Sequence, residues 1–116
     1  MPSLVGSEMC IRDSIKRRKK EKGREFDVDL EYLSNLWEAQ SGICPFTGWK
    51  LELPFHSSDW KRDSNKPKRA SLDRIDNSKG YVKGNVRFVA IMANYCRHIF
   101  SDNEVKLFCE AVSKNM

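Results

Sequence analysis

The chain has 116 residues, 32% of them charged, and its formal net charge is +5 at pH 7. This length predicts one domain with a modest hydrophobic core. No stretch approaches the roughly 18 consecutive apolar residues of a membrane-spanning helix, so no membrane association is expected. The four cysteines include no CxxC pair, which argues against a four-thiolate zinc site and against a secreted disulfide framework. We therefore expect the protein in a reducing cytoplasm.

The N-terminal segment divides into two parts. Residues 1–14 lack apolar periodicity and are too polar for a signal peptide. They resemble a translated sequencing adapter, so we expect a non-native leader that takes no part in the fold. Residues 15–25 form a basic arm, in which KRRKKEKGR at 16–24 holds seven basic residues against one acid. We expect this arm to be flexible or a frayed helix.

A helix is predicted over about 28–40, because apolar residues recur there at helical spacing. They are Leu30, Leu33, Leu36 and Trp37. Asp27 or Asp29 can cap the start of this helix, and Gly42 suits its end.

A tight turn is predicted at the start of residues 43–53, because Pro45 and Gly48 are typical turn residues. A short half-buried strand is predicted after it. Residues 54–69 show no periodicity and predict a long polar loop, a class of segment that is often functional in small domains. The end of this loop, KRDSNKPKR at 61–69, holds five basic residues against one acid.

The segment ASLDRID at 70–76 predicts a strand, and NVRFV at 85–89 predicts a second one after a glycine-bearing connection. Residues 90–100 contain no Gly or Pro and predict a helix. Ser101 and Glu104 have the spacing of a capping box that opens a last helix. The order of elements predicts an α+β fold with a central ββα unit and flanking N- and C-terminal helices.

The two basic segments predict a polyanion partner, whose phosphates would release counterions when they are neutralised. A basic surface that only keeps the protein in solution is the alternative. The residues expected to contact nucleic-acid phosphates are Arg17, Arg18, Lys61, Arg62, Lys68 and Arg69.

Four motifs in the chain have a fairly specific combined spacing. They are Cys44-Pro45-Phe46-Thr47-Gly48, the SLDRID of residues 71–76, the GYVKGNV of residues 80–86, and Asn94. Over roughly residues 26–110 the chain resembles the HNH endonucleases, the His-Me finger nucleases with a ββα-metal core, and above all their small phage-type members. The resemblance implies a nuclease domain at 26–116 that hydrolyses phosphodiester bonds in DNA, with double-stranded DNA as the partner and a bacterial or phage-infected cell as the setting.

The resemblance also assigns roles to residues of this chain. It implies that Asp73 and Asn94 are metal ligands and that Asn85 braces the loop and orients the catalytic base. His98, four residues after Asn94 and on the same helical face, matches a further ligand of many members. Such a set suits Mg²⁺ or Mn²⁺ better than structural zinc, and no small-molecule cofactor is expected. The alternative for His98 is a cation favoured at a helix C-terminus.

Arg74 stands where the family has its general-base histidine. A guanidinium has a pKa above about 12 and cannot act as a base near neutral pH. Three outcomes are open: another group such as His56 activates the water, the metal alone lowers the pKa of the water, or hydrolysis is lost and binding is kept. In each case Arg74 is expected to hold the phosphate through a bidentate contact.

The alternative function is therefore a non-catalytic nucleic-acid-binding module on the same ββα scaffold. A basic RNA-binding protein of the ribosomal kind would explain the charge, but not Asp73 and Asn94 at this spacing. The sequence sets no expectation for the oligomeric state.

Overall fold

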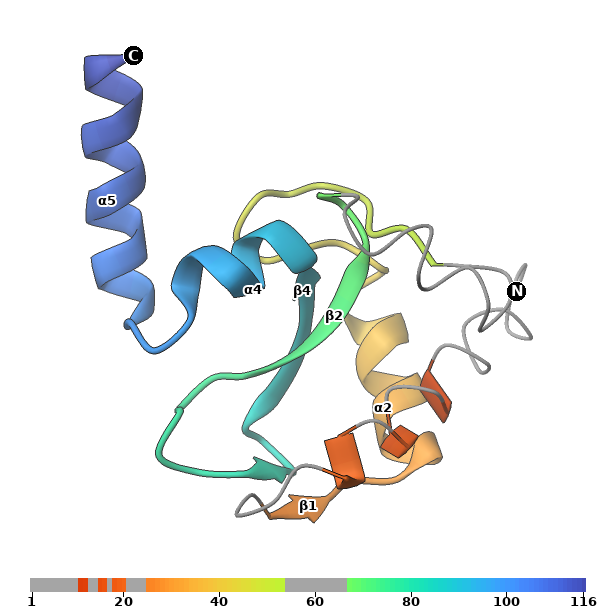
Figure 1. The fold of residues 1–116 in the computed structure, drawn as a ribbon. Coiled ribbons are helices and arrows are strands. Elements are labelled where there is room, and N and C mark those ends of the chain that lie inside the picture. Colours follow the sequence, from red (N-terminus) through yellow and green to blue (C-terminus); the bar gives the residue numbers. More distant parts are fainter. Residues whose placement is uncertain (1–10, 13–14, 17, 21–24, 54–66) are drawn as a thin grey trace.

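The computed structural model describes residues 11–12, 15–16, 18–20, 25–53 and 67–116. Within these ranges the chain forms a small α+β fold with two two-stranded sheets and the three helices labelled α2, α4 and α5 in Figure 1. A few further helical residues are described before residue 20. None of the described helices has the length and apolar composition needed to cross a membrane.

The first long helix, α2, spans Leu30–Ala39 and confirms the helix predicted near 28–40. Asp29 is its N-cap and accepts a hydrogen bond of 2.8 Å from the backbone N–H of Tyr32. The chain leaves the helix through Ser41 and Gly42, whose φ angles of 54° and 65° are left-handed. Gly42 therefore ends the helix as its position suggested.

A small parallel sheet was not predicted from the sequence. β1 (Phe26–Asp27) pairs with β3 (Tyr81–Val82), so the chain entering α2 lies beside the connection between the two central strands. Gly80 makes this approach possible, because a Cβ at this position would lie 2.4 Å from the carbonyl oxygen of Glu25. Two-residue strands carry no detectable alternation, which is why the sequence pattern misses them.

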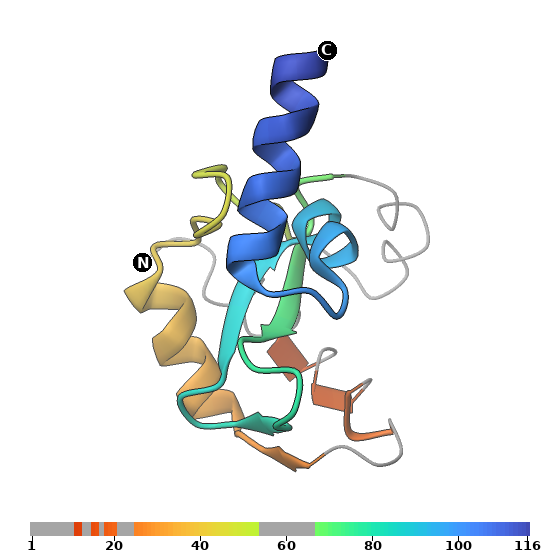
Figure 2. The same cartoon turned by 90° about the vertical axis from the view of Figure 1, so that its left-hand side faces the viewer.

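The central unit consists of β2 (Ala70–Arg74), β4 (Val86–Ala90) and α4 (Ile91–Arg97). β2 and β4 pair antiparallel, and α4 starts directly after β4 and packs against both strands. The strands predicted at 70–76 and 85–89 are confirmed, and the predicted helix is shorter than 90–100. Figures 1 and 2 show α2 and α4 on different sides of the strand pair.

The strand predicted within residues 43–53 is wrong, although the turn before it is present. The backbone N–H of Gly48 donates to Cys44 O at 2.8 Å, and that of Cys44 donates to Trp49 O at 2.9 Å, which closes a tight turn. Beyond the turn the segment makes only isolated bridges, because its backbone pairs with two different neighbours in succession. The loop at 54–66 lies outside the described residues.

Most buried apolar side chains belong to one core between α2 and the central strands. Leu33, Cys44, Leu72, Phe88 and Val89 are among them. The core also contains Ile11, which is 2% exposed, although residues 1–14 are not expected from the sequence to take part in the fold. At least one residue of that segment therefore packs onto the domain.

The last helix, α5, spans Asp102–Asn115 and begins with the predicted capping box of Ser101 and Glu104. None of the residues of α5, all of which the structure describes, is buried. The helix projects from the rest of the fold in both views (Figures 1 and 2). Leu107 and Phe108 are thus exposed rather than packed in the core, and Val105 is half-buried.

Candidate functional site

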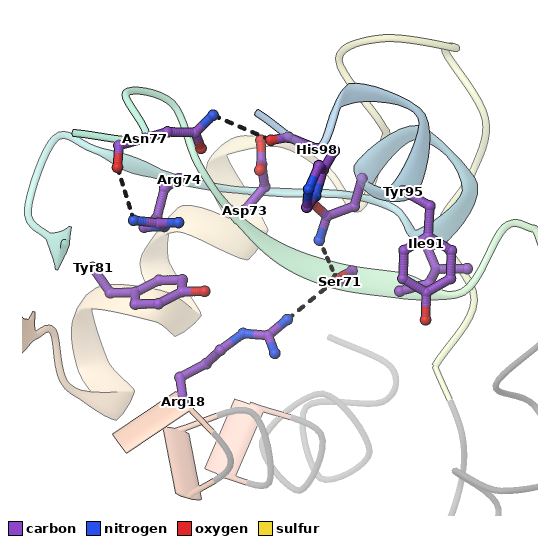
Figure 3. A pocket seen from close by; sticks show the side chains of 10 residues that line it. Arg18, Ser71, Asp73, Arg74, Asn77, Tyr81, Ile91, Tyr95 and His98 are labelled. Carbon is purple, nitrogen blue, oxygen red and sulfur yellow. Dashed lines mark hydrogen bonds between the residues drawn. The ribbon is translucent and has the colours of Figure 1, made fainter. Parts of the chain in front are cut away.

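A polar cavity of about 260 Å³ opens beside the central strands (Figure 3). β2 contributes Ser71, Asp73 and Arg74 to its wall. Asn94 of α4 and His98, the residue that caps the end of α4, line it as well. Five predicted site residues therefore line one cavity: Asp73, Arg74, Asn94, His98 and the predicted phosphate contact Arg18.

Local backbone geometry brings these groups together. Ser71 and Asp73 are two residues apart in a strand and therefore share one of its faces. Asn94 lies within α4, whereas His98 follows the last helical residue and has a left-handed φ of 46°. His98 thus reaches the cavity from the turn that ends the helix and not from within the helix, although its backbone N–H still donates to Asn94 O at 3.0 Å.

The carboxylate of Asp73 is buried, with 5% of the residue exposed, and both of its oxygens accept hydrogen bonds from arginines. Oδ2 lies 2.9 Å from Arg87 Nε, and Oδ1 lies 3.1 Å from Arg97 Nη1. Arg97 Nη1 is also 3.4 Å from Oδ2. Burying a charged carboxylate is costly unless it is paired and hydrogen-bonded, and these contacts supply both.

Asp102, in the first turn of α5, completes a ring of ion pairs with the same two arginines. Its Oδ1 lies 2.8 Å from Arg87 Nη2 and 3.0 Å from Arg97 Nε, and its Oδ2 accepts from Arg87 Nη1 at 2.9 Å. The hydrogen bond from Arg87 lowers the pKa of Asp102. Burial alone would lower the pKa of Arg87, but the hydrogen bonds to Asp102 and Asp73 raise it overall.

Sequence reasoning missed three of these four charged residues. Arg87 lies directly opposite Asp73 in the antiparallel register, so pairing the two predicted strands would have found it. Arg97, which is 3% exposed, also donates to Arg74 O at 2.7 Å and to Ile75 O. It binds the end of β2 to α4, and no local pattern in the sequence signals that contact.

Asn85 is buried and braces the connection after β2 rather than lining the cavity. Its Oδ1 accepts from the backbone N–H of Asp76 at 2.8 Å, and its Nδ2 donates to Asp76 O at 3.1 Å and to Gly80 O at 2.8 Å. The side chain therefore acts as the loop brace that the resemblance implied. A role in orienting a catalytic base stays a prediction.

The guanidinium of Arg74 is held in place by the same connection. Its Nη1 donates to Asn77 O at 3.0 Å and to Lys79 O at 3.1 Å, and its Cζ lies 5.5 Å from the centroid of the Tyr81 ring. Arg18 Cζ lies 5.8 Å from the same ring, and Arg18 Nη2 donates to Leu72 O at 3.3 Å. Two guanidinium groups therefore flank Tyr81 at the cavity (Figure 3).

A metal ion at this cavity would have to be held by Asp73, Asn94 and His98. The amide of Asn94 donates through Nδ2 to Ser71 Oγ at 2.8 Å, which leaves its oxygen, the atom that hard cations prefer, for another partner. The described residues contain no group of three His, Cys, Asp or Glu side chains that could hold a metal ion. The predicted set has only two such side chains and an amide.

The predicted phosphate contacts outside the cavity have mixed outcomes. Lys68 is exposed, with its Nζ 5.5 Å from the centroid of the Trp49 ring. Arg69 is 4% exposed, which does not favour the predicted contact of its guanidinium with a phosphate. Its backbone is bonded to the first residue of α4, because Arg69 O accepts from Ile91 N at 2.7 Å. Arg17, His56, Lys61 and Arg62 lie outside the described residues.

Comparison of the chain with protein-family models, with curated proteins and with solved structures found no match in any of the three. The residues that line the cavity and the motif resemblance are therefore the observations that bear on function.

Proposed function

We propose that this protein is an HNH-type, metal-dependent endonuclease that hydrolyses phosphodiester bonds in DNA, with β2, β4 and α4 as its ββα-metal core. One observation carries the proposal: Asp73, Asn94 and His98 line the same cavity as two arginines, Arg18 and Arg74. Carboxylate, amide and imidazole groups suit a divalent cation, and guanidinium groups suit a phosphate. A site for phosphodiester hydrolysis needs both kinds of group.

The arginines can hold the substrate. A guanidinium has five N–H donors. Arg74 commits Nη1 to two backbone carbonyls, so its remaining nitrogens can bind phosphate oxygens without losing their orientation. Because the loop already restrains this side chain, binding costs little conformational entropy. Arg74 is thus a substrate-binding residue and not a base.

The residues present fit one divalent ion. A carboxylate has about four lone-pair sites, two on each oxygen. Two hydrogen bonds occupy Oδ2 of Asp73 and one occupies Oδ1, so about one lone-pair site on Oδ1 remains for a metal ion. Asp73 Oδ1, the amide oxygen of Asn94 and the ring of His98 would hold Mg²⁺ or Mn²⁺. When bound, the ion would stabilise negative charge on the phosphate and lower the pKa of a bound water. Arg87 and Arg97 keep Asp73 in position for this role.

A second candidate function is nucleic-acid binding without cleavage. The observation that favours it is the pairing of both Asp73 oxygens with Arg87 and Arg97, which competes with metal binding. In that case the cavity binds a phosphate through Arg18 and Arg74 and releases it unchanged.

Separate measurements of DNA affinity and DNA cleavage distinguish the two functions. We expect Asp73→Asn to abolish Mg²⁺-dependent cleavage while it changes the affinity for duplex DNA less than about threefold. The variant loses the proposed anionic metal ligand, but Asn keeps an oxygen acceptor for the arginines around it, and the proposed phosphate contacts Arg18 and Arg74 are unchanged. Arg74→His, which restores the histidine of the family, should retain or raise the cleavage rate. Cleavage by Arg74→His but not by the wild-type chain would instead identify a binding module with a disabled nuclease site.

A further inference from the structure

A second hollow of about 730 Å³ adjoins the first cavity. The two share Arg74, Asn77 and His98 in their walls, so a ligand that extends beyond the first cavity can enter the second. The second hollow is also lined by Lys79 and Ile99, which the first is not.

The wall between the two hollows is held in one conformation by hydrogen bonds. Asp76 Oδ1 accepts from Ser78 N at 2.9 Å and from Ser78 Oγ at 2.6 Å, and these bonds lower the pKa of Asp76. Asn77 Nδ2 donates to His98 O at 3.1 Å and so joins the loop to the end of α4. With the Asn85 brace, these contacts make residues 76–80 a preformed wall rather than a loose turn.

The lining of the second hollow combines a cationic part with an apolar part. Arg74 and the exposed Lys79 supply positive charge, and Ile99, which is 69% exposed, supplies apolar surface. Glu25 is the single carboxylate among the residues of this lining, so the balance remains positive. A nucleotide has the matching composition, because a charged phosphate adjoins the largely apolar faces of a sugar and a base.

We propose that the second hollow is a binding subsite for the nucleotide next to the phosphodiester in the first cavity. Lys79 neutralises the phosphate of that nucleotide, Ile99 contacts its sugar, and Arg74 lies between the two phosphates. This inference rests on the proposed function, since it needs a nucleic-acid strand in the first cavity. It holds for cleavage and for binding alone.

The salt dependence of DNA binding tests the role of Lys79. Each neutralised phosphate contributes about 0.9 to the slope of log K against log salt concentration for duplex DNA. Fluorescence anisotropy of a labelled duplex, with the full chain in EDTA, should give a slope about 0.9 smaller in magnitude for Lys79→Ala than for the wild type. Lys114→Ala is the matched control, because Lys114 is an exposed lysine in the last turn of α5, and its slope should equal that of the wild type.

Ile99 provides an independent test. Ile99→Ala should weaken binding about fivefold through lost apolar contact and leave the salt slope unchanged. Its matched control is Leu107→Ala, which truncates an exposed apolar residue of α5 and should bind like the wild type. Circular dichroism verifies that each variant is folded, and the Lys79 side chain is exposed, so its loss removes no core contact.

The outcomes separate failure of the subsite from failure of the proposed function. The subsite proposal is overturned, while DNA binding stands, if the salt slope of Lys79→Ala equals that of the wild type. It is also overturned if the slope falls as much in Lys114→Ala as in Lys79→Ala. If the wild-type chain itself has no salt-dependent affinity for DNA, the proposed function and the subsite fall together. A lowered slope in Lys79→Ala alone, with weakened binding at unchanged slope in Ile99→Ala, supports the subsite.

Discussion

Asp73 and Arg97 form a buried ion pair, with 3.1 Å between Oδ1 and Nη1 and side chains that are 5% and 3% exposed. The pair joins the strand that carries the predicted metal ligand to the helix that carries Asn94. Removing one partner of a buried pair leaves an uncompensated charge. The geometry of the cavity and the stability of the fold therefore depend on the same contact.

Replacement of Arg97 by Met should lower the free energy of unfolding by about 3 kcal/mol, because Asp73 and the backbone carbonyls of Arg74 and Ile75 lose a donor. Urea denaturation measures this change. Arg97→Lys keeps the charge but lacks the planar guanidinium that bonds several acceptors at once. Its free energy of unfolding should therefore lie between those of the wild type and Arg97→Met. A loss below about 1 kcal/mol in Arg97→Met would show that the pair contributes little.

The stability of the fold should fall at acidic pH in part through Asp102. Its pKa is lower in the folded chain than in the unfolded one, so its contribution is complete above the ordinary pKa of 3.8 and is lost as the pH falls through the lower folded value. Because Asp102 is half exposed, we expect less than about 1 kcal/mol. In Asp102→Asn the free energy of unfolding should fall less steeply as the pH is lowered. Some decrease should remain, because the pKa values of Asp76 and Glu104 are also lowered in the folded chain.

The capping box of α5 should control that helix locally. Ser101 Oγ accepts from Glu104 N at 3.2 Å, and Ser101 N donates to Glu104 Oε1 at 3.0 Å. Loss of an N-cap costs about 1 kcal/mol. Since no residue of α5, described throughout, is buried, we expect Ser101→Ala to speed hydrogen exchange of α5 amides with little effect on the core. Equal acceleration in β2 and β4 would contradict this independence.

Two glycines of one connection should differ in the consequence of their replacement by alanine. In Gly80→Ala the added Cβ would overlap the carbonyl of Glu25, so β1 and β3 must separate. In Gly84→Ala no atom lies within 4 Å of the new Cβ, and the cost is the left-handed φ of 85°, about 1 kcal/mol. Exchange of the Tyr81 amide, which donates to Glu25 O at 2.7 Å, should therefore accelerate more in Gly80→Ala.

The sequence predicts the helices and the two central strands because each has a local signal, namely apolar periodicity, an N-cap or a glycine-bearing turn. It predicts four of the cavity residues through one cluster of motifs. It does not predict the ring around Asp73, because Arg97 meets Asp73, and Asp102 meets Arg87 and Arg97, only through tertiary packing. It also does not predict that α5 is exposed, since an amphipathic pattern shows which face is apolar and not what covers it.

Metal-dependent nicking of supercoiled plasmid by the full chain distinguishes a nuclease site from a site that only binds nucleic acid. We expect relaxed plasmid in Mg²⁺ or Mn²⁺, none in EDTA, and at least a hundredfold slower nicking by Asp73→Asn. Loss of a ligand would weaken binding of the ion that stabilises transition-state charge, and losing one such stabilising interaction costs about 10² to 10³ in rate. Folding of the variant is verified by circular dichroism. Nicking by Asp73→Asn at the wild-type rate, or intact plasmid with every metal tested, would contradict the assignment of this cavity as a nuclease site.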